Sequence, residues 1–398
     1  MEKEFILIYD FCTKHFGAML RRTVITNLAH LTLAFLILFS SVRSNYGGLT
    51  LASIARALWM QTKFEYRYKR LNRFLDNKYF DANSLAEGMI SMVMAGYNEP
   101  YAVVIIDQTS KGDVQIMMGG VPYEGRCIAL AWRTFEYPLP LKNVSQNYME
   151  NILITWIQEA FPKEIKPLFI MDRGYARVSL ISALNKIKHP FIIRSPKKVM
   201  VEVTIKGKRK KLLLDRLPYK MGKPCLYKNA LYHSKKKEKV NIIIYHDPSY
   251  KQPWFLIASS ECKITLSPEE VVALYRQRMR IEQGFRDWKT HLGLRGLNLQ
   301  VRKAESILRL LMGFSLAYLI AMMLGNSSWA QSLRSYMEES RNVPRNNTIR
   351  ILSVLTLALS LLAHPAFTND AWKTIIAIIK NLNKGYGLLY ACGPPIDA

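Results

Sequence analysis

The alternation of apolar and polar residues divides the chain into helical ends and a mixed centre. Residues 1–98 show helical periodicity, and from residue 99 the period shortens to that of strands. The apolar runs that predict strands are YAVVIID, VQIMMGGV, CIALAWRTF, PLFIMDRG and FIIRS. Helical patterns at 145–161 and 178–187 separate the last three runs. This succession indicates an α/β fold with a mixed sheet flanked by helices.

A basic segment at residues 194–239 interrupts that alternation. It holds 16 Lys/Arg against 3 Asp/Glu, a local net charge of +13. Its β-branched and aromatic residues lie in short runs, namely VEVTIKG, KKLLLDRL, PCLYKNALYH and VNIIIYH. Such runs favour a β-rich insertion, at about 195–250, over a disordered basic loop. The stretch KQPWFLIASS then predicts a return to the core sheet.

The stretch YRQRMRIEQGFRDWKT, residues 275–290, is predicted to lie on one helix that begins at Ser-Pro-Glu-Glu, residues 267–270. This start combines an N-cap Ser, a Pro at the first helical position and a Glu three residues after the cap. At about 100° per residue, four side chains fall within roughly 60° of one another: Tyr275, Arg278, Glu282 and Lys289. Taken alone, this face is explained as well by a solvated charged helix.

The N-terminal region contains a basic helix after a short turn. LTLASIARALWMQ and EYRYKRLNRFLDN predict two helices separated near residues 62–63. The second helix interleaves aromatic residues with four cations, Arg67, Lys69, Arg70 and Arg73. This pattern is typical of helix-turn-helix DNA contact, and an ordinary helical hairpin with a solvated face explains it equally well.

Charge and cysteine usage narrow the functional classes. The 398 residues carry 56 Lys/Arg and 30 Asp/Glu, a formal net charge of +26. This excess favours a polyanionic partner, either nucleic acid or an anionic membrane surface. The five cysteines are odd in number and form no CxxC pair, so we expect reduced thiols without a zinc site.

Three apolar runs, at residues 24–42, 310–324 and 351–363, raise the question of a membrane. Polar residues interrupt the first run, and the other two fall short of the roughly 20 residues that span a bilayer. We therefore expect buried core helices and no membrane partner. The first residues lack the basic start and apolar core of a signal peptide, which favours a cytoplasmic location.

Three acids stand out in this basic chain. Asp107 and Asp172 each end an apolar strand run, where a buried carboxylate is costly unless it is paired or binds a metal. Glu282 lies on the helix that follows the sheet. Each aspartate alone is more simply explained as a turn or capping residue. Together the three carboxylates predict a site for hard divalent cations, beside cations that would hold phosphates.

The spacing Tyr275-x2-Arg278-x3-Glu282-x6-Lys289 resembles the Y-R-E-K signature of bacterial DDE transposases of the insertion sequence 4 family, especially its transposon-ten branch. The acids in VVIIDQTS and FIMDRG resemble that family's first two catalytic positions. The resemblance covers roughly residues 60–325. It implies an RNase H-like core with a β-insertion between the second Asp and the Glu, where the basic segment lies.

Further roles follow from this resemblance. It implies that Asp107, Asp172 and Glu282 are catalytic and bind Mg²⁺ or Mn²⁺, as two ions. It also implies that DNA near the element's end is held by Tyr275, Arg278 and Lys289, with Trp254 stacking on an extruded base and Arg194 contacting DNA. Trp254 is explained equally well as a core or edge-strand aromatic.

The sequence therefore predicts a cut-and-paste transposase with three regions: a helical DNA-binding region at 1–98, an RNase H-like core at 99–325 and a helical region at 326–398. The resemblance implies strand cleavage, hairpin formation at the element's ends and transfer to target DNA. It also implies a homodimer on double-stranded DNA, at the nucleoid of a bacterial cytoplasm. The alternatives are an RNase H-like metal nuclease or resolvase, an inactive DNA-binding remnant of a mobile element, and a non-enzymatic basic protein on a membrane or nucleic acid.

Overall fold

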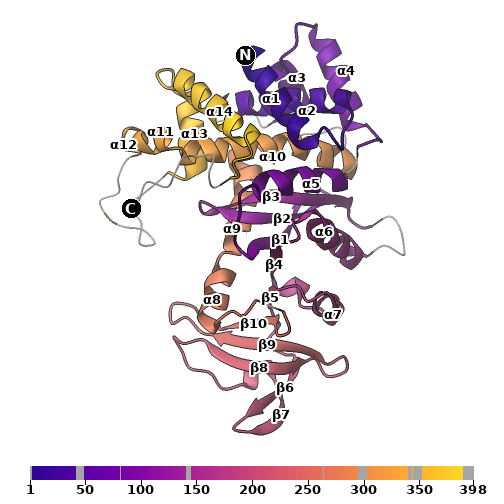
Figure 1. Cartoon of the computed structure of the whole chain (residues 1–398), viewed down its shortest axis with the longest axis vertical. Helices are drawn as coiled ribbons and strands as arrows, with labels where there is room; N and C mark the ends of the chain where they lie inside the picture. Colours follow the sequence, from indigo (N-terminus) through magenta and orange to yellow (C-terminus); the bar gives the residue numbers. More distant parts are fainter. Residues whose placement is uncertain are drawn as a thin grey trace.

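The computed structural model describes residues 2–41, 49–80, 82–139, 145–262, 264–294, 303–338, 343 and 352–388. Figure 1 shows an elongated molecule whose N- and C-terminal helices gather at one end. A sheet flanked by helices occupies the middle, and the strands of the insertion form the opposite end. The N-terminal and C-terminal helices therefore lie together at one end, and the sheet with its insertion extends away from them.

All the strands of the described residues form one sheet, in the order β3-β2-β1-β4-β5-β10-β9-β8-β6-β7. Strand β4 is parallel to β1 and β5 is parallel to β4, whereas β2 and β3 are antiparallel neighbours. The order 3-2-1-4-5 with an antiparallel second strand is that of an RNase H-like sheet. These strands are β1 (Tyr101–Lys111), β2 (Val114–Tyr123), β3 (Arg126–Glu136), β4 (Lys166–Met171) and β5 (Phe191–Arg194). The α/β fold class is confirmed.

The insertion continues the same sheet rather than forming a loop. Strand β10 returns antiparallel to β5, and the remaining strands add to it as antiparallel neighbours. They are β6 (Met200–Ile205), β7 (Lys208–Leu213), β8 (Cys225–Tyr232), β9 (Glu238–Tyr245) and β10 (Trp254–Ser259), with a short helix η2 (Leu214–Arg216). The prediction of a β-rich insertion is therefore confirmed.

Helices cover both faces of the central sheet. Because side chains alternate across a strand, β3 shows which helix lies on which face. Trp132 Nε1 and Thr134 Oγ1 donate to backbone carbonyls of α10 at 3.2 and 2.7 Å, while Arg133 lies over the ring of Trp156 on α6. The helices next to the sheet are α5 (Ala82–Val93), α6 (Gln146–Ala160) and α10 (Ala304–Asn326).

Helix α10 joins the sheet to the terminal helices. Almost every residue of α10 is buried, and the helix packs against α2, α13, α14 and β3. One hydrophobic core consequently runs from the N-terminal helices through the sheet. The other terminal helices are α1 (Glu2–Phe16), α2 (Arg22–Ser41), α3 (Leu51–Ala57), α4 (Phe64–Leu75), α11 (Ser328–Ser332), α12 (Arg334–Met337), α13 (Val354–Ala363) and α14 (Thr368–Asn383). The domain boundaries themselves stay a prediction.

The expected length of the apolar helices was wrong in one case. Two described helices, at Arg22–Ser40 and Ala304–Asn326, are long and apolar enough to cross a membrane by length and composition. The run at residues 310–324 is longer as a helix because α10 also includes flanking residues such as Glu305 and Arg309. Buried core helices pass the same test, and the apolar window of α10 is 100% buried in the protein.

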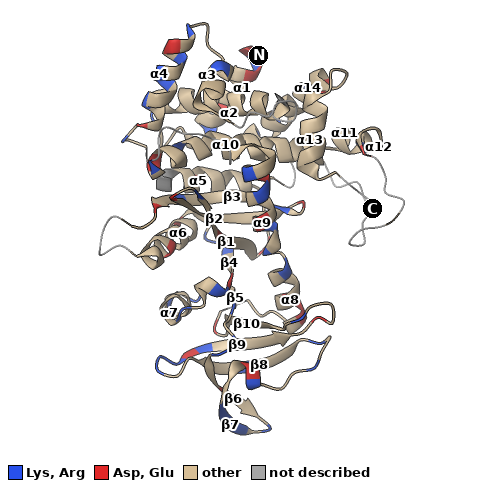
Figure 2. Ribbon diagram, turned by 180° about the vertical axis from the view of Figure 1, so that it is seen from behind, with Lys and Arg blue, Asp and Glu red and all other residues tan. Residues whose placement is uncertain are grey.

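The predicted N-terminal helix pair is present as α3 and α4, but part of its charge is used inside the protein. Arg67 Nη1 donates to the Arg56 carbonyl at 3.0 Å, which ties α4 to α3. Arg70 Nε donates to Asn27 Oδ1 on α2 at 2.6 Å, and Lys69 pairs with Glu65. Figure 2 shows α4 as a basic helix at the end of the molecule. Its contact with DNA stays a prediction.

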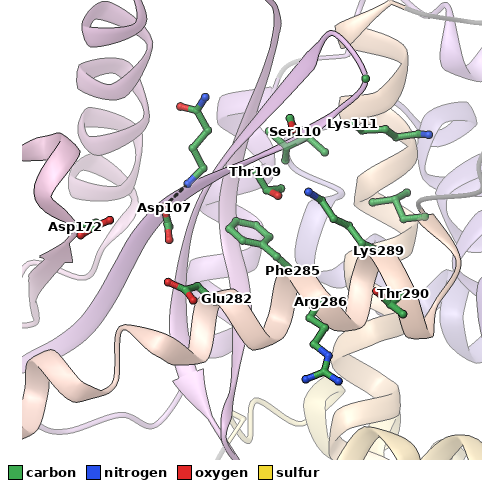
Figure 3. Close-up of a pocket in the computed structure, with 14 residues that line it drawn as sticks. Asp107, Thr109, Ser110, Lys111, Asp172, Glu282, Phe285, Arg286, Lys289 and Thr290 are labelled. Carbon is green, nitrogen blue, oxygen red and sulfur yellow. Dashed lines mark hydrogen bonds between the residues drawn. The ribbon is translucent and has the colours of Figure 1, made fainter. Parts of the chain in front are cut away.

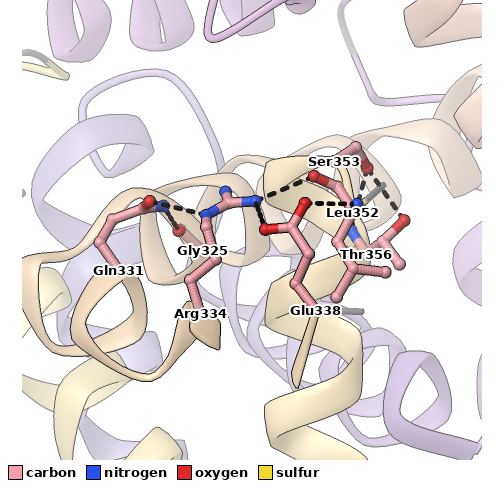
Figure 4. A network of polar contacts seen from close by, with 7 residues as sticks. All are labelled: Gly325, Gln331, Arg334, Glu338, Leu352, Ser353 and Thr356. Carbon is pink, nitrogen blue, oxygen red and sulfur yellow. Dashed lines mark hydrogen bonds and ion pairs between the residues drawn. The ribbon is translucent and has the colours of Figure 1, made fainter. Parts of the chain in front are cut away.

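A partly buried ion pair fastens the C-terminal helices to one another (Figure 4). Arg334 Nη1 donates to Glu338 Oε2 at 3.1 Å and to the Leu352 carbonyl at 3.0 Å. Glu338 Oε1 in turn accepts from the Leu352 backbone N–H at 3.1 Å. This network joins α12 to the start of α13, far from the carboxyl edge of the central strands.

Four cysteines lie within the described residues, and all four are free thiols. Cys12 and Cys127 are buried, and Cys225 and Cys262 are partly exposed. Cys392 lies outside the described residues. The expectation of reduced thiols without a zinc site stays a prediction.

Candidate active site

Strands β1 and β4 bring Asp107 and Asp172 to the same edge of the sheet. Their parallel pairing ends with Ile106 opposite Met171, so the two acids follow the last paired residues. Asp172 caps the short helix η1 (Arg173–Tyr175), and its Oδ1 accepts from the Arg173 backbone N–H at 2.5 Å. Adjacent carboxyl ends of parallel strands are where α/β sheets bind ligands.

The prediction that Asp107 ends its strand was wrong. Strand β1 continues to Lys111, because its other edge stays paired with β2 as far as Lys111 opposite Val114. Only the pairing with β4 stops before Asp107. The end of the apolar run in the sequence marks where β1 stops pairing with β4, and not where strand β1 ends.

The single helix predicted across residues 267–290 is also wrong in part. The expected capping box is present at Ser267 and Glu270, but helix α8 (Pro268–Arg276) ends before Arg278. Helix α9 (Met279–Arg286) follows and changes to a π-helix, η3 (Asp287–His291). The signature residues therefore do not share one regular helical face.

Arg278 lies between two of the acids. Its Nη1 donates to Asp107 Oδ2 at 3.2 Å and its Nη2 donates to Glu282 Oε1 at 2.5 Å. The Arg278 side chain is only 10% exposed, whereas that of Glu282 is 43% exposed. Burial alone would lower the pKa of Arg278, but Tyr275, Glu282 and Asp172 nearby raise that pKa overall.

The three acids line one cavity of about 820 Å³. Figure 3 shows Asp107, Asp172 and Glu282 on one side of the cavity, and Lys111 and Lys289 on the other. Burial raises the pKa of Asp107 to about 6, and the charges of the other two acids add to this increase. The cavity thus places clustered carboxylates beside cations that can bind phosphate.

Trp254 and Tyr275 belong to an aromatic cluster beside this cavity. The Trp254 ring lies 5.1 Å from that of Tyr275, edge to face, and 6.2 Å from that of Tyr250 in a stacked arrangement. Burial raises the pKa of Tyr275 to about 12, and the charges that act on it include those of Asp172 and Arg194. Tyr275 therefore lies between the aromatic cluster and the acids.

Arg194 lies at the end of β5 and lines a smaller basic pocket rather than the main cavity. The cations of this pocket are Arg173, Arg194 and Lys197. The structure therefore brings the three acids, Arg278, Tyr275 and Lys289 to one region and places Arg194 at its border. DNA contact by these residues stays a prediction.

A buried carboxylate holds the π-helix that carries Lys289. Asp287 is 1% exposed and pairs with Arg126 of β3. Tyr318 of α10 donates to Asp287 Oδ2 at 3.2 Å. π-turns are often found at functional sites, and here the turn sets the position of Lys289 along the cavity.

The donor set suits a divalent cation. Three carboxylates provide the hard oxygen ligands that Mg²⁺ and Mn²⁺ prefer. The Tyr175 hydroxyl is buried without a hydrogen-bond partner among the described residues. Burial raises the pKa of Tyr175, and the nearby charges of Asp107 and Asp172 raise it further. A hydroxyl without a partner at this position could form a hydrogen bond with a water molecule bound to the ion. In the described part of the chain, however, no three acidic, His or Cys side chains form a ready ligand cluster, and Arg278 separates Asp107 from Glu282.

Sequence reasoning missed a buried acid next to the site. Glu150 of α6 is 1% exposed and pairs with Arg177. It lies with Asp107, Asp172 and Tyr175 around a second cavity, of about 420 Å³. A signal for Glu150 was present, because it shares the apolar spacing of α6 with Leu153, Ile154 and Ile157, where a charged residue is unexpected.

Within the chain, residues 146–320 match the family model described as "Transposase DDE domain". The matched segment contains Asp172 and the whole 275–289 signature, and Asp107 precedes it.

Among solved structures, the chain is similar to the piggyBac transposase in a synaptic complex with hairpin DNA. The two share 11% sequence identity, with a TM-score of 0.43, over 96% of this chain and 82% of that one. This likeness is too distant to carry an argument about function. The search of curated proteins found no match.

Proposed function

We propose that the protein is a cut-and-paste DNA transposase of the insertion sequence 4 type. It would cleave DNA at the ends of its element and join the freed ends to target DNA. The observation that carries the proposal is one cavity lined by Asp107, Asp172 and Glu282 together with Lys289. The three acids are widely separated in the sequence, and Asp172, Glu282 and Lys289 lie in the segment that matches the transposase DDE domain.

Asp107, Asp172 and Glu282 would hold two Mg²⁺ or Mn²⁺ ions. When bound, such ions activate water and stabilise the leaving oxygen of a phosphodiester. Arg278 must then release at least part of its contact with Asp107 and Glu282, since those oxygens are the proposed ligands. Its guanidinium would become available to a DNA phosphate, which it can bind through two parallel hydrogen bonds.

The remaining residues would position the DNA. Lys289 and Arg278 supply positive charge beside the acids, which offsets the repulsion between carboxylates and phosphates. Tyr275 is buried against Trp254, so it would orient that indole as well as approach the DNA end. The Trp254 indole is partly exposed, and an indole can stack on an extruded base.

The proposed reaction has four phosphoryl-transfer steps. Water attacks a phosphodiester at the element's end, and the break leaves a 3′-OH on one strand. That 3′-OH attacks the opposite strand, which forms a hairpin and releases the flanking DNA. A second water reopens the hairpin, and the restored 3′-OH joins target DNA. A homodimer would bring the two ends together.

Excision from a plasmid tests this proposal. The substrate is a supercoiled plasmid that carries the coding region with its genomic flanks, incubated with the full chain in Mg²⁺. The proposed function predicts breaks at the two flanks and an excised fragment with hairpin or freshly opened ends. Nicks spread over the plasmid would instead favour the nuclease alternative, and intact plasmid with bound protein would favour an inactive remnant.

A further inference from the structure

The buried acid Glu150 lies next to the site without belonging to the three-acid set. Its side chain is 1% exposed in the second turn of α6, and burying a charge is costly unless it is paired and hydrogen-bonded. Both of its carboxylate oxygens have a partner, and the two partners lead to different strands. Because the two oxygens contact different segments, Glu150 can do more than fill space in the core.

The first partner leads to Asp172. Arg177 Nη2 forms an ion pair with Glu150 Oε2, and Arg177 Nη1 donates to the Gly174 carbonyl at 2.8 Å. The Arg177 guanidinium also lies 5.9 Å from the centroid of the Tyr175 ring. Arg177 thereby fastens the turn that begins at Asp172 to helix α6, just before helix α7 (Val178–Lys186) starts.

The second partner leads to Asp107. Gln146 Nε2 donates to Glu150 Oε1 at 3.2 Å and to Gln108 Oε1 at 2.9 Å. The backbone N–H of Gln108 donates to Asp107 Oδ1 at 2.8 Å. One buried carboxylate is therefore connected through hydrogen bonds to the segments that carry both strand acids.

We propose that Glu150 is a positioning residue that holds Asp107 and Asp172 at the spacing a divalent cation requires. The inference rests on the proposed function, because it takes these two acids as metal ligands. Glu150 acts through Arg177 and Gln146 and touches neither the ion nor DNA. Residues that orient metal ligands from outside the ligand set typically change metal affinity by about 10- to 100-fold when they are lost.

Mn²⁺ binding to the full chain without DNA tests the inference. Free Mn²⁺ is counted by electron paramagnetic resonance during titration, and thermal unfolding is followed in parallel. Glu150→Gln keeps the size of the side chain but removes the charge that holds Arg177. We expect its Mn²⁺ affinity to fall by about tenfold or more.

Loss of a buried ion pair also destabilises a protein, so a matched control is needed. Glu338→Gln breaks a partly buried pair at the C-terminal helices, in which the Glu338 side chain is 7% exposed and that of Arg334 is 12% exposed. We expect a comparable fall in unfolding temperature with unchanged Mn²⁺ affinity. If both variants lose Mn²⁺ affinity equally, or if neither does, the positioning role is wrong.

Two further variants keep every outcome decisive. Arg177→Lys keeps the charge of the pair but cannot hold Glu150 and the Gly174 carbonyl together, so it should lower Mn²⁺ affinity. This test applies even if Glu150→Gln does not fold. Unchanged Mn²⁺ affinity of Arg177→Lys would overturn the inference. Asp172→Asn identifies the acid-dependent binding. If Asp172→Asn lowers Mn²⁺ affinity and Glu150→Gln does not, the positioning role fails alone. If Asp172→Asn has no effect, the proposed metal site fails as well.

Discussion

The Asp107 carboxylate is 19% exposed and accepts hydrogen bonds from Arg278 and from the Gln108 backbone. Burial nevertheless raises its pKa from 3.8 to about 6. The folded chain therefore binds this proton more tightly than the unfolded chain between about pH 4 and pH 6. Protonation of Asp107 stabilises the metal-free fold at low pH, and that contribution is lost as the pH rises through 6.

Replacing Asp107 with Asn should remove this pH dependence. Relative to wild type, the free energy of unfolding of Asp107→Asn should increase by about 2–3 kcal/mol between pH 4 and pH 7, because one pKa unit corresponds to about 1.4 kcal/mol. Urea unfolding in the presence of a chelator measures the difference. A difference that stays constant with pH would mean that Asp107 is not buried as described.

Trp254 provides a second prediction for a single residue. A hairpin forms more easily if one base leaves the stack and finds an aromatic surface, and such stacking is worth about 1–3 kcal/mol. Trp254→Ala should therefore slow hairpin formation by roughly 5- to 150-fold and leave the first nick nearly unchanged. A time course on end-containing DNA should show the nicked intermediate accumulating.

Trp254→Phe is the matched control, since it keeps an aromatic face and most of the contact with Tyr275. It should form hairpins close to the wild-type rate. Equal slowing of nicking and hairpin formation by Trp254→Ala would instead assign Trp254 a structural role through Tyr275. No slowing of either step would place Trp254 away from the DNA.

At the scale of elements, local pattern predicted the strands and helices well, and tertiary contacts account for the differences. The sequence signals of α8 are complete, with a capping box and Pro at the start. Nothing comparable marks its end, where Arg278 reaches the carboxylates of Asp107 and Glu282. The π-helix at 287–291 occurs where Asp287 pairs with Arg126, a partner 161 residues away in the sequence. The periodicity of the sequence depends on neither contact.

The same reasoning explains which site residues could be predicted. Asp107, Asp172 and Glu282 can be proposed from the sequence because each is an acid at the edge of an apolar or cationic pattern. The position of Arg278 between two of them depends on the crossing of β1 and α9, which sequence spacing does not specify. Glu150 could have been predicted, since it interrupts the apolar face of α6. Its contacts with Gln146 and Arg177 can be seen only in the three-dimensional structure.

The edge strand β7 provides a prediction for an element. Figure 2 shows β7 as a basic strand at the far end of the sheet. If its exposed lysines contact phosphates, log affinity for duplex DNA should fall linearly with log salt, by about 0.9 per phosphate. Lys208, Lys210 and Lys211 replaced together by Ala should flatten that slope. Arg209 is left in place because it pairs with Glu202 at 3.6 Å.

Lys373 and Lys380 of α14, together with Lys384 directly after this helix, are exposed and provide a control with the same loss of charge. Replacing them should leave the slope close to that of wild type. An unchanged slope in the β7 variant would mean that its lysines serve another purpose. Lysines on an edge strand also prevent the sheet from pairing with other chains, and aggregation of the β7 variant would reveal that role.

For the whole molecule, the main feature is one sheet that connects a helical end to a basic end. The net charge of +26 gives the chain a long-range attraction for polyanions. Strands β1 and β4 and helix α9, which position the three acids, lie in the middle of this length, between the helical end and the insertion (Figure 1). DNA bound along the molecule could therefore contact cations on both sides of the three acids.

Cleavage by single-acid variants tests the central claim most directly. Asp107→Asn, Asp172→Asn and Glu282→Gln are compared with wild type on the flank-bearing plasmid in Mg²⁺, with DNA binding measured separately in a chelator. Each variant removes a proposed metal ligand and no cation, so each should lose cleavage by about 1,000-fold or more while it still binds DNA. Near-wild-type cleavage by any one of them would contradict the assignment of that acid and the three-acid site with it.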